Sequence, residues 1–138
     1  MNYYIYLITP FVAWLICGIT KFVVNCLKER RLAFDLIGYG GMPSNHSTIV
    51  SSMASLIAFK EGIDTPVFGS ALTFAFIVIL DASSLRKQIG KHAQAINQLK
   101  NYHNMKLRER IGHSRAEILV GIFLGVGIGF LLSEYILI

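Results

Sequence analysis

The apolar residues of this chain gather into four blocks separated by short polar or basic segments. The first and last blocks approach the ~20 residues that a helix needs to cross a bilayer at about 1.5 Å per residue. The two middle blocks are shorter and become polar at their ends. We therefore predict an all-α, polytopic membrane protein, a bundle of about four transmembrane helices. The expected spans cover residues 4–24, 47–59, 66–80 and 118–138.

The composition supports a membrane-embedded chain of a single domain, residues 1–138. Of its 138 residues, 54% are hydrophobic and only 15% are charged. Soluble domains carry roughly 45–50% apolar and about 25% charged residues. Four spans with short connections leave little mass outside the bilayer.

The net charge of +5 lies mostly in two segments, one after the first block and one between the third and fourth. The positive-inside rule predicts that both segments face the cytoplasm and that both termini lie outside the cell membrane. No secretory signal pattern is visible, so the first block is expected to be retained. Beside membrane spans, anionic lipid or a phosphate headgroup is a nearer partner than nucleic acid. The bases are Lys28, Arg30, Arg31, Arg86, Lys87, Lys91, Lys100, Lys106, Arg108 and Arg110.

The two cysteines predict neither a disulfide nor a metal site. Cys17 and Cys26 are nine residues apart along one expected helix, a separation of about 13 Å. No cysteine spacing typical of a metal site occurs.

Polar residues mark the start of the second span. Pro43 and Ser44 favour the first turn and the cap of a helix, and Asn45 and His46 follow them. The glycine-rich segment 36–41 before them lets the backbone turn back toward the membrane. The serines and the threonine within the span predict close helix contacts and hydrogen bonds within the bundle. These residues are Ser47, Thr48, Ser51, Ser52 and Ser55.

The fourth span begins with a second polar cluster. Ser114 can cap the helix with Glu117 in the capping-box position. Alternatively, Glu117 lies one turn after His113 and can accept its ring N–H. Both alternatives are compatible with the sequence.

A stripe of small residues follows along the fourth span. Gly121, Gly125 and Gly129 recur every four residues, which permits close backbone contact with another helix. We predict that this stripe is a packing face.

Two basic features near span ends have alternative interpretations. Lys21 can place its charge at the membrane interface or contact a phosphate. Asp81 ends the third span and precedes Arg86, Lys87 and Lys91 on a helix expected to extend to about residue 99. These residues can form a solvated cap or a phosphate clamp.

Together these motifs resemble the divergent branch of the type-2 phosphatidic acid phosphatase superfamily, which is related to the vanadium haloperoxidases. The resemblance covers about residues 21–129. Its strongest parts are residues 40–46, residues 81–86 with Gly90 and Asn97, and residues 112–113 with Glu117 and Gly121.

Several positions depart from the broader superfamily. Asn45 replaces the glycine of Pro-Ser-Gly-His, and Glu117 replaces an aspartate. Lys21 is followed by Lys28-Glu29 instead of Arg-Pro, and Lys106-Leu107 stands in place of a Ser-Arg pair. The candidates for the missing guanidinium are Arg86, Arg108 and Arg110.

The resemblance implies hydrolysis of a lipid phosphomonoester or pyrophosphate through a phosphohistidine, and we expect no metal and no cofactor. Suitable lipids are phosphatidic acid, phosphatidylglycerol phosphate and polyprenyl phosphates. It implies that His113 is the nucleophile, Glu117 its orienting partner and His46 the general acid and base. The implied phosphate-binding residues are Ser44, Asn45, Lys21, Arg86 and Lys87, while His92 and His103 are interpreted as surface histidines.

Two other functions fit the same sequence. One is a non-catalytic module that binds or transports a lipid phosphate on the same bundle. The other is a small structural or channel subunit, which leaves the two helix-start histidines unexplained. A homo-oligomer is compatible with four short spans.

Overall fold

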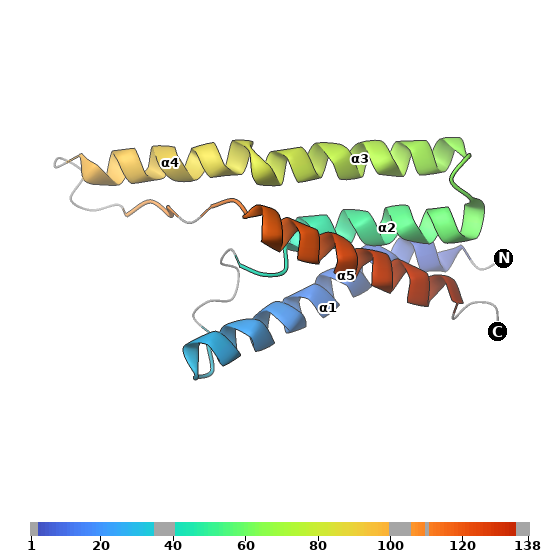
Figure 1. The fold of residues 1–138 in the computed structure, drawn as a ribbon, viewed down its shortest axis with the longest axis horizontal. Helices are drawn as coiled ribbons and strands as arrows, with labels where there is room; N and C mark the ends of the chain where they lie inside the picture. The colour runs from blue at the N-terminus through green and yellow to red at the C-terminus, as the bar shows by residue number, and fades with distance from the viewer. Residues whose placement is uncertain (1–2, 35–40, 100–105, 110, 135–138) are drawn as a thin grey trace.

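The computed structural model describes residues 3–34, 41–99, 106–109 and 111–134. These residues form an all-α membrane protein without strands in the described part (Figure 1). The predicted turn at 36–41, apart from Gly41, lies outside the described residues, as do Lys100, His103, Arg110 and the end of the last expected span. The described helices are α1 (Tyr4–Glu29), α2 (Asn45–Glu61), α3 (Pro66–Ser83), α4 (Leu85–Gln98) and α5 (Arg115–Glu134).

The helix boundaries follow from local sequence. Thr65 caps α3 by accepting from the Phe68 N–H at 3.3 Å, and Pro66 occupies the first turn, where no N–H is needed. Arg30 and Gly62 end α1 and α2 with φ values of 51° and 96°. The first helix therefore continues to Glu29, five residues beyond the predicted span, and includes the basic Lys28.

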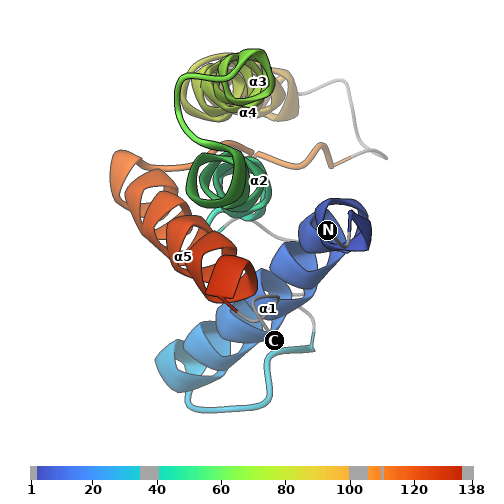
Figure 2. The ribbon, with the colours of Figure 1, turned by 90° about the vertical axis from the view of Figure 1, so that its right-hand side faces the viewer.

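The second helix is the centre of the bundle. In an end-on view, α2 is surrounded by α1, α3 and α5 (Figure 2). Its serine and threonine side chains are mostly buried, and several bond to backbone carbonyls of their own helix. The polar character of α2 is thus compatible with burial, because its hydroxyl groups are satisfied locally.

Three helical segments in the described part are long and apolar enough to cross a membrane: α1, the α3–α4 segment from Pro66 to Gln98, and α5. The second predicted span differs, because α2 has only 17 residues and many hydroxyl groups. Large apolar side chains on α1, α3 and α5 remain exposed, as expected for surfaces that face lipid. Examples are Phe11, Trp14, Phe74, Phe76 and Phe123.

The predicted glycine stripe of α5 packs against α2, and the two helices run parallel. A Cβ atom on Gly121 would lie 2.7 Å from the Ser44 carbonyl oxygen, and one on Gly125 would lie 2.5 Å from that of Thr48. A Cβ on Gly129 would meet Ser52 and Ser55. Each step of four residues along α5 therefore matches a step of four along α2, so the prediction of a packing face is confirmed.

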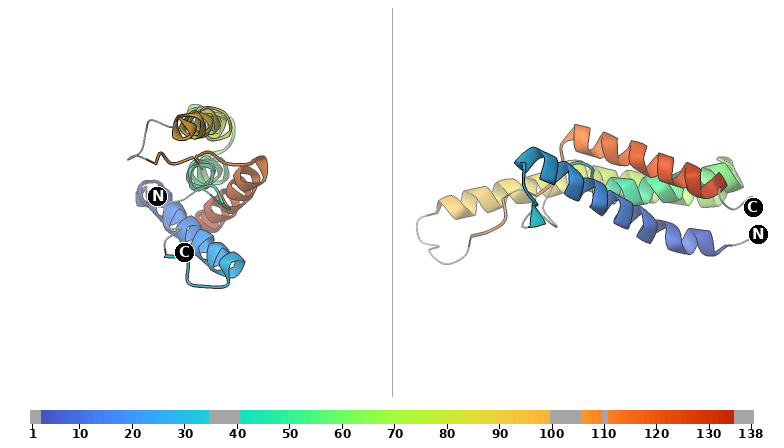
Figure 3. Two further views of the ribbon diagram at one scale, coloured as in Figure 1. Left: turned by 90° about the vertical axis from the view of Figure 1, so that its left-hand side faces the viewer. Right: turned by 90° about the horizontal axis from the view of Figure 1, so that it is seen from below.

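Helices α3 and α4 form one long rod that extends beyond the rest of the bundle (Figures 1 and 3). The helix is interrupted at Ser84, whose φ and ψ are −114° and −75°. The described part of the following segment returns along α4. Asn97 holds it through two hydrogen bonds with the Leu107 backbone, at 2.8 and 2.9 Å, and a Cβ on Gly90 would lie 2.5 Å from the Glu109 carbonyl oxygen.

Candidate active site

The predicted polar clusters meet at one end of the bundle, opposite to the termini. Both termini lie at the same end in Figure 1, and α2 and α5 start at the other. The end of α3 and the start of α4 reach the same region, as Arg86 and the Ala82 carbonyl show by their contacts. The site is therefore assembled from segments that are up to about 90 residues apart in the chain.

The parallel arrangement of α2 and α5 places two helix N-termini together. The Ser44 N–H donates to the Glu117 carbonyl oxygen at 3.0 Å and ties these two starts to each other. Backbone N–H groups at a helix start favour an anion, because they lack partners within the helix and carry the positive end of its dipole.

His113 is held by backbone contacts just before α5. Its N–H donates to the Ala82 carbonyl oxygen at 3.2 Å, where α3 ends. The preceding Gly112 has a φ of 98° and lies against the start of α4, where a Cβ would be 2.9 Å from the Lys87 nitrogen. A side chain at Gly112 would therefore be both strained and obstructed.

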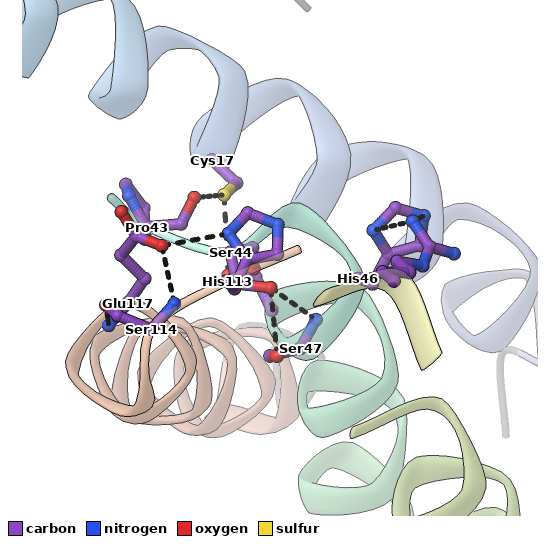
Figure 4. A network of polar contacts seen from close by, with 10 residues as sticks. Cys17, Pro43, Ser44, His46, Ser47, His113, Ser114 and Glu117 are labelled. Atoms are coloured by element: carbon purple, nitrogen blue, oxygen red, sulfur yellow. Dashed lines mark hydrogen bonds and ion pairs between the residues drawn. The ribbon is translucent and has the colours of Figure 1, made fainter. Parts of the chain in front are cut away.

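Glu117 adopts both of its predicted roles at once. Its Oε2 lies 3.3 Å from His113 Nδ1 and accepts the Ser114 N–H at 2.9 Å (Figure 4). In return, the Glu117 N–H donates to Ser114 Oγ at 3.2 Å, which completes a capping box. The same contacts that start α5 therefore also orient the imidazole.

The His113 ring lies in a partly buried, positively charged setting. Its side chain is 9% exposed, and that of Glu117 is 18% exposed. Burial is the main cause that lowers the pKa of His113 below its usual 6.5, and the charge of Lys21 lowers it further. The Glu117 contact opposes this shift. The imidazole is accordingly neutral near pH 7.

Ser44 is fully buried and acts as the cap of α2. Its Oγ accepts from the Ser47 N–H at 3.5 Å and from the Ser47 hydroxyl at 3.0 Å. The structure thus places the Ser44 side chain inside the helix start, where it supports the backbone N–H groups of the next residues.

Asn45 carries an unusual buried atom at this helix start. Its Oδ1 is buried and has no hydrogen-bond partner among the described residues. Oxygen and nitrogen of an amide are assigned from their surroundings, so the other orientation would present an NH₂ donor there. An unpaired buried amide atom costs about 1–3 kcal/mol, which a bound ligand can offset.

His46 contacts the guanidinium group of Arg86. Arg86 Nη1 lies 3.4 Å from His46 Nδ1 and 3.3 Å from Nε2. Similar distances to both nitrogens indicate that the guanidinium contacts the ring as a whole. Burial is the main cause that lowers the pKa of His46, followed by the charge of Arg86.

The remaining cations of the predicted site occupy different positions. Lys21 is only 8% exposed on α1, and its charge acts on both histidines. The Lys87 side chain is exposed, and it is the backbone of Lys87 that packs on Gly112. The structure therefore brings Lys21 and Arg86 to the histidines, whereas Lys87 contributes to the wall of the site through its backbone.

Two participants were not singled out from sequence as site residues. Asp81 binds Arg86 Nε at 2.6 Å, and the Ala82 carbonyl holds the His113 backbone. The run of Asp81 to Arg86 was noted as either a solvated cap or a clamp. The helix interruption at Ser84, between Ser83 and Leu85, gives this run its geometry, and no proline or glycine in the sequence marks that position.

The other histidine of the described part and the two cysteines have different surroundings from the site residues. His92 is exposed on α4. Both cysteines are free, and Cys17 is buried against Thr48 and the Pro43 carbonyl. No group of three or more His, Cys, Asp or Glu residues in the described part is arranged to hold a metal ion.

Comparisons with known proteins agree with this architecture. Residues 4–128 match the model of the Divergent PAP2 family, so the chain belongs to that family. It is also 26% identical over 148 residues to the Uncharacterized membrane protein YuiD of Bacillus subtilis (strain 168), which covers 94% of each chain. No solved structure matches the chain significantly.

Proposed function

We propose that this member of the Divergent PAP2 family is an integral membrane phosphatase that hydrolyses a lipid phosphomonoester or pyrophosphate. The observation that carries the proposal is the contact of His113 with Glu117 at the meeting point of two helix starts, beside His46 and Arg86. An orienting carboxylate, a second histidine and fixed positive charge are the groups that phosphoryl transfer through histidine requires.

The proposed reaction begins at His113. Because Glu117 contacts Nδ1, that nitrogen carries the proton and the lone pair of Nε2 is available. Nε2 attacks phosphorus, and a P–N bond forms while the bond from phosphorus to the lipid oxygen breaks. His46 gives a proton to the departing oxygen, and Glu117 stabilises the positive charge that develops on His113.

The second step returns the protein to its starting state. His46 removes a proton from water, and the resulting hydroxide attacks phosphorus. The P–N bond breaks, its electron pair returns to His113 Nε2, and inorganic phosphate leaves. His113 becomes neutral, and His46 is protonated again.

Binding of the phosphoryl oxygens is assigned to the helix starts and cations. Asn45 and the backbone N–H groups of Asn45 and His46 form one side, with Ser44 as the cap that holds this helix start. Lys21 and Arg86 supply positive charge near the histidines, and the exposed Lys87 attracts the headgroup.

The proposed substrates are phosphatidic acid, phosphatidylglycerol phosphate and polyprenyl phosphates. In a membrane-spanning bundle, the acyl or prenyl chain stays in lipid while the headgroup reaches the polar end. We place that end at the cytoplasmic side of the cell membrane, with both termini outside, because the basic α4 lies at the end where the histidines meet.

The test is phosphate release from these lipids by the purified protein in lipid nanodiscs. His113→Ala is expected to lower the rate by roughly 10⁴-fold or more, and His46→Ala by roughly 10²- to 10⁴-fold. His92→Ala is the matched control, since His92 is exposed on α4, and it should leave the rate unchanged. Hydrolysis that survives both site changes would reject the proposed site.

A second candidate is a module that binds lipid phosphate without turnover. It is favoured by the Arg86 contact with His46, because a nearby positive charge opposes the protonated form that an acid catalyst needs. Binding of the same lipids by wild type, with no phosphate release from any of them, would support this candidate over hydrolysis.

A further inference from the structure

Asp81 and Arg86 form an ion pair across the interruption between α3 and α4. Arg86 Nε donates to Asp81 Oδ2 at 2.6 Å, while Nη1 of the same guanidinium lies 3.3 Å from His46 Nε2. One guanidinium nitrogen is thus bound by an acid on α3, and another is placed at a candidate catalytic histidine.

We infer that Asp81 is a positioning residue whose carboxylate fixes the Arg86 guanidinium beside His46, where it binds the phosphate of the substrate. This inference rests on the proposed function for the identity of the anion, a phosphate. It gives Arg86 the place of the guanidinium that the superfamily supplies from elsewhere in its sequence.

The geometry depends on the helix interruption. Residues five apart on a regular α-helix are separated by about 140° around the axis, so their side chains do not normally face each other. The break at Ser84 lies between Asp81 and Arg86 in the chain. It changes the direction of the Arg86 side chain relative to a regular helix, so that the two side chains meet. The same break presents the Ala82 carbonyl to the His113 N–H, so one irregularity serves both histidines.

The free donors of Arg86 suit a phosphate. A guanidinium has five N–H groups in a planar fork. Asp81 accepts at Nε and Nη1 lies beside His46, and the remaining N–H groups can donate to an anion bound next to the histidine. The side chains of Arg86 and Asp81 are 33% and 31% exposed, so a headgroup can reach them. Without Asp81, Arg86 would sample many rotamers and meet the phosphate less often.

A purely structural role for the pair makes a different prediction. If the ion pair only joined α3 to α4, removing Asp81 would disturb the site whether or not Arg86 were present. If Asp81 acts through Arg86, its removal should have no further effect once the guanidinium is gone.

The experiment measures binding of inorganic phosphate to the purified full chain in nanodiscs by calorimetry. Asp81→Asn should weaken binding roughly tenfold, by analogy with the loss of a residue that orients a metal ligand, and Arg86→Ala at least as much. The double variant should bind no more weakly than Arg86→Ala. Asp64→Asn is the control, because Asp64 is an exposed acid between α2 and α3, and it should bind as wild type does.

Two results would overturn the inference: wild-type binding by Asp81→Asn, or an equal loss from Asp81→Asn in the wild-type and Arg86→Ala backgrounds. If Asp81→Asn does not fold, Asp81→Glu keeps the charge across the junction but displaces the guanidinium. It should fold and bind phosphate more weakly, and wild-type binding by Asp81→Glu would also overturn the inference.

Phosphate binding separates this inference from the proposed hydrolysis. The expected binding pattern without hydrolysis of any lipid would reject the phosphatase proposal and leave the role of Asp81 intact. Hydrolysis with phosphate binding that is insensitive to Asp81 would reject the role of Asp81 alone.

Discussion

One carboxylate oxygen of Glu117 contacts both the His113 ring and the Ser114 N–H. The charge of Glu117 matters to the histidine, whereas an uncharged oxygen suffices for the helix cap. Glu117→Gln should therefore lower phosphate release by roughly 10²- to 10⁴-fold. Its stability should change by less than about 1 kcal/mol, because the amide oxygen can still accept the Ser114 N–H. Turnover and thermal unfolding of the purified protein measure the two effects.

Glu117→Ala provides the comparison, since it removes the cap as well as the charge. It should lose about 1 kcal/mol more stability than Glu117→Gln, while the two variants should release phosphate at similar rates. Near-wild-type turnover in Glu117→Gln would contradict an electrostatic role for this carboxylate.

The lowered pKa values of the two histidines predict that hydrolysis is fastest at acidic pH. His113 must be neutral to attack, so its competent form increases above its pKa, while His46 must be protonated, so its competent form increases below its own pKa. Both pKa values are lowered from 6.5, mainly by burial. The product of the two competent fractions peaks midway between the pKa values, and kcat/KM should therefore be greatest below pH 6.5. A maximum above pH 7 would contradict these roles.

Arg86→Ala tests the cause of the shift at His46. Loss of this positive charge should raise the pKa of His46. The decline of kcat/KM on the alkaline side of its pH profile should therefore move to higher pH, even though the rate is lower. Lys91→Ala removes an exposed cation from the same helix and should leave this decline in place. The substrate phosphate ionises in the same way for all variants, so its ionisation cannot explain a shift that occurs in Arg86→Ala alone.

Residue patterns predicted the local parts of the site but not its long-range contacts. His113 and Glu117 are only four residues apart at the start of one helix, so their contact could be expected. The contact of His46 with Arg86 joins residues forty positions apart and depends on how α2 packs against α3. A single sequence contains no direct record of that packing, which left Arg86 as one of several candidates.

Among the elements, the α2–α5 pair sets the register of the site. The three stripe glycines match a four-residue repeat of serine and threonine on α2, so a shift of one turn would separate Ser44 from Glu117. The two helices approach closely because glycine has no side chain. The atoms that an added Cβ would meet include backbone atoms of Ser44, Thr48 and Ser52.

Gly125→Ala should destabilise the protein by about 1–3 kcal/mol, as overpacking of a close contact usually does. The added Cβ would lie 2.5 Å from the Thr48 carbonyl oxygen and 2.9 Å from Ser51 Cβ, so one helix would have to move. Gly125→Leu should prevent assembly of the pair. Thermal unfolding and size-exclusion chromatography in detergent measure these changes.

Gly127→Ala is the matched control on the same helix. No atom beyond the adjacent backbone of its own helix lies within 4 Å of the position that its Cβ would take, and alanine is the better helix former by about 1 kcal/mol. It should be as stable as wild type or more stable. Equal stability of Gly125→Ala and Gly127→Ala would contradict the proposed packing.

Element positions were predictable where apolar length and capping residues agreed. The starts of α2, α3 and α5 follow proline, threonine and serine signals that act within one turn. The interruption at Ser84 was not predicted, since no proline or glycine marks it. It is maintained by tertiary contacts, among them the His113 N–H and the Asp81–Arg86 pair.

For the whole molecule, the start of α1 and the end of α5 lie at one end, and α2 and α5 begin toward the other, where their first residues form the candidate site (Figure 3). Basic residues of α4 extend beyond the bundle at the site end. The connection between α2 and α3, which contains Asp64, lies at the end of the termini (Figure 1). A membrane between these ends separates the two regions, so their accessibility from either side reports the orientation.

Single cysteines at these two positions should therefore react differently with a membrane-impermeant maleimide. In a Cys17→Ala/Cys26→Ala background, Asp64→Cys should be labelled in intact cells, because the positive-inside rule places that end outside. Gln94→Cys, on the exposed face of α4, should be labelled only after the membrane is opened. The reverse pattern would place the histidines on the outer side and require a substrate from the outer leaflet. Labelling of both sites in intact cells would indicate that the bundle does not separate its two ends across the membrane.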